Sequence, residues 1–105
     1  MNTDLKNKWI QAMESGEYQF GSGELRDDDN CFCALGVLCN IIDPGKWFMS
    51  ENRATRWYDP NCNTFIPENI QEEIGITQSQ ITNIWNLNDI YKSYQPVIDY
   101  IKENL

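Results

Sequence analysis

The segment from residue 46 to residue 58 combines cationic and aromatic side chains. It holds three of the eight bases and one acid, a local charge of +2, whereas the rest of the chain carries −10. Guanidinium groups form two-pronged hydrogen bonds with carboxylate or phosphate, and Trp or Tyr faces stack on planar rings. An alternative stays open, in which the Trp rings complete the core and the Arg side chains pair with acids. The first interpretation predicts an anionic, ring-bearing ligand held by Trp47, Arg53, Arg56, Trp57 and Tyr58.

Three residues outside that segment have side chains suited to the same ligand. Arg26 is a further candidate for the binding site. Asn88 or Asp89 could read ribose or base edges, because amide and carboxylate groups supply hydrogen-bond donors and acceptors. No cofactor is expected to take part.

The four cysteines have the number, but not the spacing, of a zinc site. Structural zinc pairs come from cysteines two to four residues apart on a tight turn. Cys31 and Cys33 fall in an apolar run that favours a helix, where positions two apart diverge by about 200°. Cys39 and Cys62 do not improve the spacing. We therefore expect reduced cysteines that pack as small hydrophobic residues, and no metal.

The acidic residues carry little specific information. Residues 27–29 are three consecutive Asp, which could hold a divalent cation through oxygens but lack the ligand spacing of a calcium loop. A solvated turn that precedes a helix is the preferred interpretation. A pair of catalytic carboxylates can always be chosen from 16 acids, so that signal has no specificity.

Composition excludes several classes of function. With 105 residues the chain is expected to form a single domain, residues 1–105. A net charge of −8 opposes direct binding to nucleic acid or an anionic membrane. The absence of histidine removes Ser-His and Cys-His nucleophile pairs and His-ligated metal. No apolar run is long enough to span a membrane and the first four residues do not resemble a signal peptide, so a soluble cytoplasmic protein is expected. The lack of catalytic residue pairs predicts that it is not an enzyme.

The N-terminal half must position Arg26. A helix capped by Thr3 is predicted to end at residues 15–16. Residues 18–20 and 24–26 flank a Gly-Ser-Gly turn, which predicts a β-hairpin. The apolar run at 31–42 predicts a buried helix, in which Gly36 would be explained by a chain segment that crosses closely.

The C-terminal half is predicted to be mostly helical. Residues 46–65 are expected to be an irregular aromatic loop, and residues 68–74 a short helix that starts after Pro67. Thr77 and Gln80 form the pattern of a capping box at the start of the next helix, with residues 86–89 as a loop or frayed end. The last helix is expected from Ser93. The fold class is thus α+β, a helix-dominated domain with a small β-hairpin or sheet and a long aromatic loop.

Several motifs occur in a fixed order along nearly the whole chain. They lie at residues 9–18 (Trp to Tyr), 25–26 (Leu-Arg), 33–39 (Cys to Cys), 66–68 (Ile-Pro-Glu), 75–76 (Gly-Ile) and 87–89 (Leu-Asn-Asp), before the closing helix. In this order the chain resembles a widespread family of small phage and prophage proteins. Ala34 departs from the pattern, which often has a second Cys there, and this further weakens a metal site. The resemblance implies an accessory phage protein in the host cytoplasm, but no particular reaction.

Two classes of function remain. The first is a phage counter-defence protein that binds and sequesters a small nucleotide-like immune signal without catalysis, as a homo-oligomer. The alternative is an acidic inhibitor that docks on a host defence protein by imitating nucleic-acid charge. A hydrolase of such a signal ranks third, because only a carboxylate could serve as its base.

Overall fold

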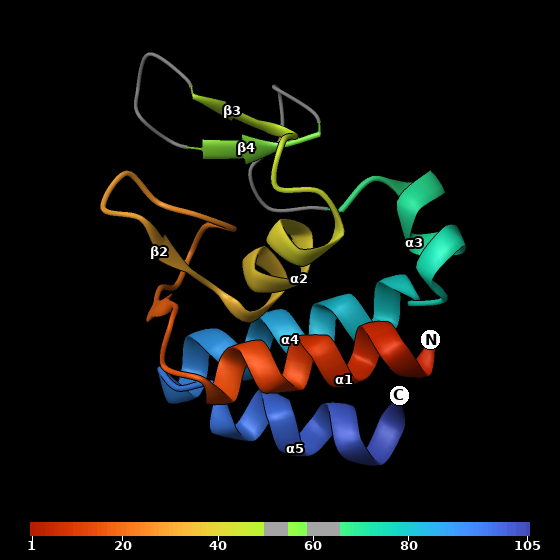
Figure 1. The fold of residues 1–105 in the computed structure, drawn as a ribbon. Helices are drawn as coiled ribbons and strands as arrows, with labels where there is room; N and C mark the ends of the chain where they lie inside the picture. Colours follow the sequence, from red (N-terminus) through yellow and green to blue (C-terminus); the bar gives the residue numbers. More distant parts are fainter. Residues whose placement is uncertain (50–54, 59–65) are drawn as a thin grey trace.

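The computed structural model describes residues 1–49, 55–58 and 66–105. They form a helix-dominated α+β fold, as expected (Figure 1). In chain order the elements are α1 (Thr3–Glu14), β1 (Gln19–Phe20), β2 (Cys31–Phe32), α2 (Ala34–Ile42), β3 (Trp47–Met49), β4 (Thr55–Trp57), α3 (Glu68–Ile74), α4 (Gln78–Tyr91) and α5 (Gln95–Asn104).

Helix α2 lies between two layers of different character (Figure 1). On one side α1 and α4 contact it, and α5 packs against both of these helices. We call α1, α4 and α5 the helical layer. On the other side are β1 to β4 and residues 21–30, which we call the strand layer. The fully buried side chains come from both layers and from α2, and include Trp9, Leu25, Leu35, Leu38, Trp57, Ile84, Ile98 and Ile101.

Helix boundaries follow mostly local signals. Helix α3 begins after Pro67 as predicted, and Gly75 ends it in the left-handed conformation at φ 77°. The capping box of Thr77 and Gln80 is present at the start of α4. At α1 the expectation was one residue off, because Asn2 is the cap and its side chain accepts from the amide of Leu5 at 3.1 Å. Helix α5 begins at Gln95 rather than Ser93, with Pro96 in its first turn.

The apolar run at residues 31–42 is only partly helical. Cys31 and Phe32 form a strand, and Cys33 caps α2 with its sulfur, which accepts from the amide of Gly36 at 3.4 Å. The predicted helix start at residue 31 was therefore wrong by three residues. The expected close crossing at Gly36 is confirmed, because a side-chain carbon there would overlap the backbone carbonyl of Leu25.

The predicted hairpin between residues 18–20 and 24–26 is wrong. Strand β1 pairs in parallel with β2, with Gln19 opposite Cys31 and Phe20 opposite Phe32. Gly21 extends this pairing, since its amide donates to the carbonyl of Phe32 at 2.9 Å. Arg26 instead forms an isolated antiparallel bridge with Phe32. Residues 21–30 thus make a wide loop whose two ends meet β2.

Two segments expected to be irregular have regular structure. Strands β3 and β4 form an antiparallel pair, with Trp47 opposite Trp57 and Phe48 opposite Arg56. The remaining parts of that expected loop, 50–54 and 59–65, lie outside the described residues. Residues 86–89, expected to be a loop or frayed end, continue α4, which ends only at Lys92. None of the described helices has the length and hydrophobicity needed to cross a bilayer.

Candidate ligand-binding site

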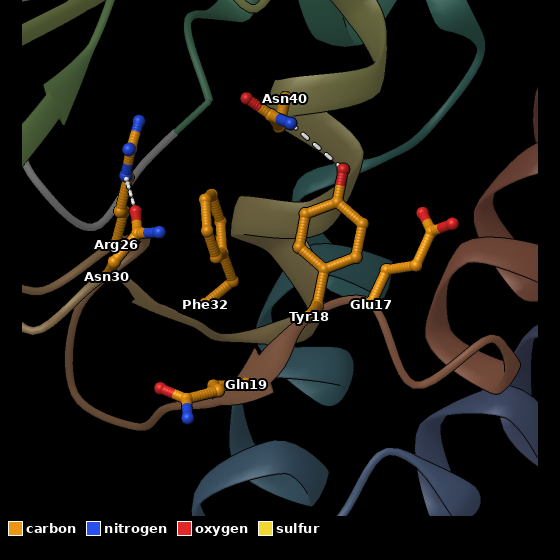
Figure 2. A pocket seen from close by; sticks show the side chains of 7 residues that line it. All are labelled: Glu17, Tyr18, Gln19, Arg26, Asn30, Phe32 and Asn40. Atoms are coloured by element: carbon orange, nitrogen blue, oxygen red, sulfur yellow. Dashed lines mark hydrogen bonds between the residues drawn. The ribbon is translucent and has the colours of Figure 1, made fainter.

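A cavity of about 360 Å³ opens on the strand layer above α2 (Figure 2). Its walls come from the residues around β1, from the loop that precedes β2, from β2 itself and from α2. This volume is at the lower end of the range for small-molecule sites. The lining residues are Glu17, Tyr18, Gln19, Arg26, Asn30, Phe32 and Asn40.

Arg26 is the cation of this cavity. Its guanidinium carbon lies 5.0 Å from the ring centre of Phe32 and 5.3 Å from that of Trp47. Its Nε donates to the Oδ1 atom of Asn30 at 2.8 Å. The one ion pair between described residues joins Lys102 and Glu14, so no described carboxylate neutralises Arg26. The two terminal nitrogens of Arg26 donate to no described residue and keep their capacity for an anionic group.

A chain of hydrogen bonds fixes the aromatic wall of the cavity. The amide nitrogen of Asn40 donates to the hydroxyl of Tyr18 at 2.9 Å, and Nε1 of Trp47 donates to Oδ1 of Asn40 at 3.0 Å. The rings of Tyr18 and Phe32 meet edge to face, with centroids 4.9 Å apart and planes at 87°. Because these contacts link β1, α2 and β3, the aromatic wall is held from three sides.

The acidic turn at residues 27–29 places Asn30 beside Arg26. Oδ1 of Asp27 accepts from the amides of Asp29 and Cys31, both at 2.9 Å, and Asn30 adopts a left-handed conformation at φ 64°. The three carboxylates have oxygens within 4.8 Å of one another. Asp27 is thus engaged in closing the turn, in line with the preferred interpretation of this acid run as a turn.

The aromatic segment splits between two faces of the β3–β4 hairpin. Trp57 is fully buried, and its Nε1 donates to the carbonyl of Asp43 at 2.9 Å. Trp47 points toward the cavity side, where it contacts Arg26. Side chains alternate along a strand, so Arg56 lies on the other face from the two Trp side chains. Trp57 is therefore a core residue, as the alternative interpretation had it.

Another expected site residue, Tyr58, lies outside the cavity. Tyr58 is 38% exposed, and the ammonium of Lys46 lies 5.4 Å from its ring centre. Neither side chain lines the cavity. Arg53 lies outside the described residues. From the described part of the basic-aromatic segment, the structure brings Trp47 into contact with Arg26 of the cavity.

Asn88 is buried and serves the scaffold. Its Oδ1 accepts from the amide of Ala34 at 2.9 Å, and its Nδ2 donates to the carbonyl of Gly21 at 3.0 Å. The carboxylate of Asp89 accepts from Nδ2 of Asn88 at 3.1 Å and from the amide of Gly23 at 3.2 Å. Ligand reading by these two residues stays a prediction, and their placement favours a structural role. They fix the start of α2 and the loop that carries Arg26.

The described cysteines are free thiols. Burial raises the pKa of Cys33 to about 12 and raises that of Cys39 well above its usual value. Partial burial, with the carboxylates of Asp27 and Asp29, also raises the pKa of Cys31. The thiolate is the nucleophilic form, so these raised pKa values leave the three thiols weak nucleophiles at neutral pH. Cys62 lies outside the described residues.

Most cavity residues escaped the sequence analysis. Tyr18 was expected as a strand residue and as the end of a family motif, and Phe32 as part of a buried helix, but neither was a candidate for the site. Asn40 gave the best available signal, because it is an amide side chain near the end of an otherwise apolar run. Asn40 is held in the cavity wall by hydrogen bonds to Tyr18, 22 positions earlier, and to Trp47, 7 positions later. Local periodicity does not predict such contacts.

Comparison with known protein families gives a match for the N-terminal part of the chain. A family model described as "Domain of unknown function (DUF8296)" matches residues 1–64. The match includes every residue that lines the cavity, and Trp47. No curated protein and no solved structure matches the chain. Because the match covers more than half of the 105 residues, the chain belongs to the family of this domain of unknown function, DUF8296.

Proposed function

We propose that the protein binds and sequesters a small anionic, ring-bearing ligand of the nucleotide class, without converting it. One observation carries this proposal. The guanidinium of Arg26 is held by two aromatic rings and by Asn30 at the edge of a cavity, and no described carboxylate is paired with it. A guanidinium prearranged in this way is a receptor for phosphate or carboxylate.

The cavity also suits the ring of a nucleotide. Tyr18 is partly exposed in the cavity wall and offers aromatic surface to a base, whereas Phe32 is 6% exposed and supports the guanidinium of Arg26. Base–aromatic stacking contributes about 1–3 kcal/mol per base in nucleic-acid binding proteins. Asn30 uses its Oδ1 for Arg26, so its amide nitrogen can donate to the ligand. A volume of about 360 Å³ favours a ligand of mononucleotide size over a larger one.

The chemistry of the lining residues favours binding over conversion. General acid–base catalysis needs groups that exchange protons near the reaction, and Glu17 is the single carboxylate among the lining residues. The sequence contains no histidine that could assist it. In the setting that the phage resemblance implies, the ligand is a nucleotide-like immune signal in the host cytoplasm, and its removal antagonises defence.

The first test is titration calorimetry with GMP, AMP and their 3′,5′-cyclic forms. We expect Arg26→Ala to weaken binding by about tenfold to a hundredfold, because it removes charge-assisted hydrogen bonds. Arg26→Lys should fall between Arg26→Ala and the wild type, since it keeps the charge but loses the planar fork. Lys102→Ala is the matched control, because it removes one exposed cation outside the cavity and should bind as the wild type does.

The fate of the ligand separates sequestration from catalysis. After incubation the protein is denatured by heat, and the released nucleotide is analysed by mass spectrometry. Unchanged nucleotide supports sequestration, whereas a cleaved product overturns it in favour of a hydrolase. No binding of any of the four probes, or equal binding by Arg26→Ala and the wild type, contradicts the proposal. Native mass spectrometry of the same samples tests the expectation of a homo-oligomer.

A further inference from the structure

The polar groups of the cavity are sorted between its two ends. Figure 2 shows Arg26 and Asn30 on one side of Phe32, and Glu17 beyond Tyr18 on the other side. The Arg26 end offers hydrogen-bond donors: the terminal guanidinium nitrogens and the amide nitrogen of Asn30. The Glu17 end offers a carboxylate. A ligand that spans the cavity therefore meets donors at one end and an acceptor at the other.

Glu17 has capacity left for a ligand. Its backbone amide donates to the hydroxyl of Ser15 at 3.2 Å, while its carboxylate forms no hydrogen bond or ion pair with any described residue. An ionised carboxylate only accepts hydrogen bonds, and its two oxygens can accept two parallel ones. It also repels a second anionic group at that end. The matching part of the ligand is thus a neutral edge with two adjacent donors.

Aromatic side chains separate the donor end of the cavity from its carboxylate end. The rings of Phe32 and Tyr18 lie between Arg26 and Glu17 (Figure 2). The hydroxyl of Tyr18 accepts from Asn40, so its own proton remains available to the ligand. Phe32 is buried beneath Arg26, so Tyr18 is the ring that a planar base can contact, and such a base would lie between the two polar ends.

We infer that Glu17 makes the site selective for a guanine nucleotide with a single phosphate. Guanine presents N1–H and the exocyclic amine side by side, as two parallel donors for a carboxylate. Adenine presents an amine beside a ring nitrogen that is an acceptor, so its lone pair would face the carboxylate. This inference rests on the proposed function, with the phosphate at Arg26 and the base edge at Glu17.

The test compares GMP, IMP and AMP by titration calorimetry with the wild-type protein and two variants. IMP keeps N1–H but lacks the exocyclic amine. We expect wild-type affinity to fall in the order GMP, IMP, AMP, with about tenfold or more between GMP and AMP. Glu17→Gln should weaken GMP by about tenfold and erase most of this order, because a neutral amide forms weaker hydrogen bonds. Glu72→Gln removes the same charge from α3, outside the cavity, and should behave as the wild type.

The outcomes separate this inference from the proposed function. Binding that depends on Arg26, combined with equal affinity for GMP and AMP, overturns the role of Glu17 but leaves the proposed function in place. Unchanged selectivity in Glu17→Gln does the same. Absence of binding by these three nucleotides and by both 3′,5′-cyclic forms overturns both. Glu17 is exposed, so Glu17→Gln is expected to unfold as the wild type does.

Discussion

The helical layer and the strand layer use polar groups in opposite ways. In the helical layer, buried polar groups reach across to the backbone of other elements, as when Nε1 of Trp9 donates to the carbonyl of Ala34 at 2.8 Å. Around the cavity, where the strand layer meets α2, polar side chains hold one another, as in the pairs of Asn40 with Tyr18 and of Arg26 with Asn30. The buried polar groups of the helical layer therefore have all their hydrogen bonds within the fold. The polar groups around the cavity are oriented by the fold but keep hydrogen-bond donors and acceptors for a ligand.

The two layers are joined where the strand layer needs its support. Asn88 comes from α4, yet its amide binds the start of α2 and the loop that leads to Arg26. Tyr94, next to α5, donates its hydroxyl proton to the carbonyl of Phe32 at 2.5 Å. The helical layer therefore sets the geometry of a cavity to which it contributes no lining residue.

The largest expected difference is between two Trp residues. Trp9→Ala should lower the free energy of unfolding by about 3–5 kcal/mol, because it empties a fully buried site. Trp47→Ala should cost clearly less, because part of that side chain already contacts water. Urea unfolding followed by circular dichroism measures both changes. Equal losses would mean that Trp47 is packed as a core residue and not beside an open site.

Asn88 gives the next largest effect, and it tests the connection between layers. Asn88→Ala leaves the amide of Ala34 and the carbonyl of Gly21 without their partner, and an unpaired buried group costs about 1–3 kcal/mol. Asn86→Ala, at an exposed position of the same helix, should unfold as the wild type does. If both variants have wild-type stability in urea unfolding, Asn88 is no scaffold residue, and its expected role in ligand reading regains support.

Alkaline pH should weaken α2, the helix between the layers. Burial raises the pKa of Cys33 to about 12 from the usual 9.0, so the thiol ionises in the unfolded chain first. Its contribution to stability is complete below pH 9 and is lost as pH rises toward 12. In that window each such thiol reduces the free energy of unfolding by about 1.4 kcal/mol per pH unit. The pKa of Cys39 is raised in the same direction, so Cys39→Ala should flatten the decline.

Urea titrations at pH 7.5, 9, 10 and 11, in the presence of a reducing agent, check this expectation. The pKa of Tyr94 is also raised by burial, which adds to the decline at the highest pH. Tyr94→Phe separates its share from that of the thiols. Stability that is constant up to pH 11 would show that water reaches the thiols of α2, contrary to their burial.

Helical elements and their core faces could be predicted from the sequence because the signals are local. The capping pattern at Thr77 and Gln80, the left-handed stop at Gly75 and the short helix after Pro67 all involve residues within a few positions of each other. Even the close crossing at Gly36 followed from the cost of glycine inside an apolar helix. The periodic spacing of apolar residues, which is also a local signal, predicted the helix-dominated fold class.

The tertiary structure alone decided which polar side chains meet. Arg26 and Trp47 were both candidate site residues from the sequence, but only the fold shows that they contact each other. Trp57 and Asn88 were also expected to bind the ligand, whereas the fold buries both side chains. Strand β1 pairs with β2, twelve residues away, and not with the nearer residues 24–26, and β2 in turn contacts α2. Contacts between distant side chains depend on how whole elements pack, and no local pattern in this sequence encodes that packing.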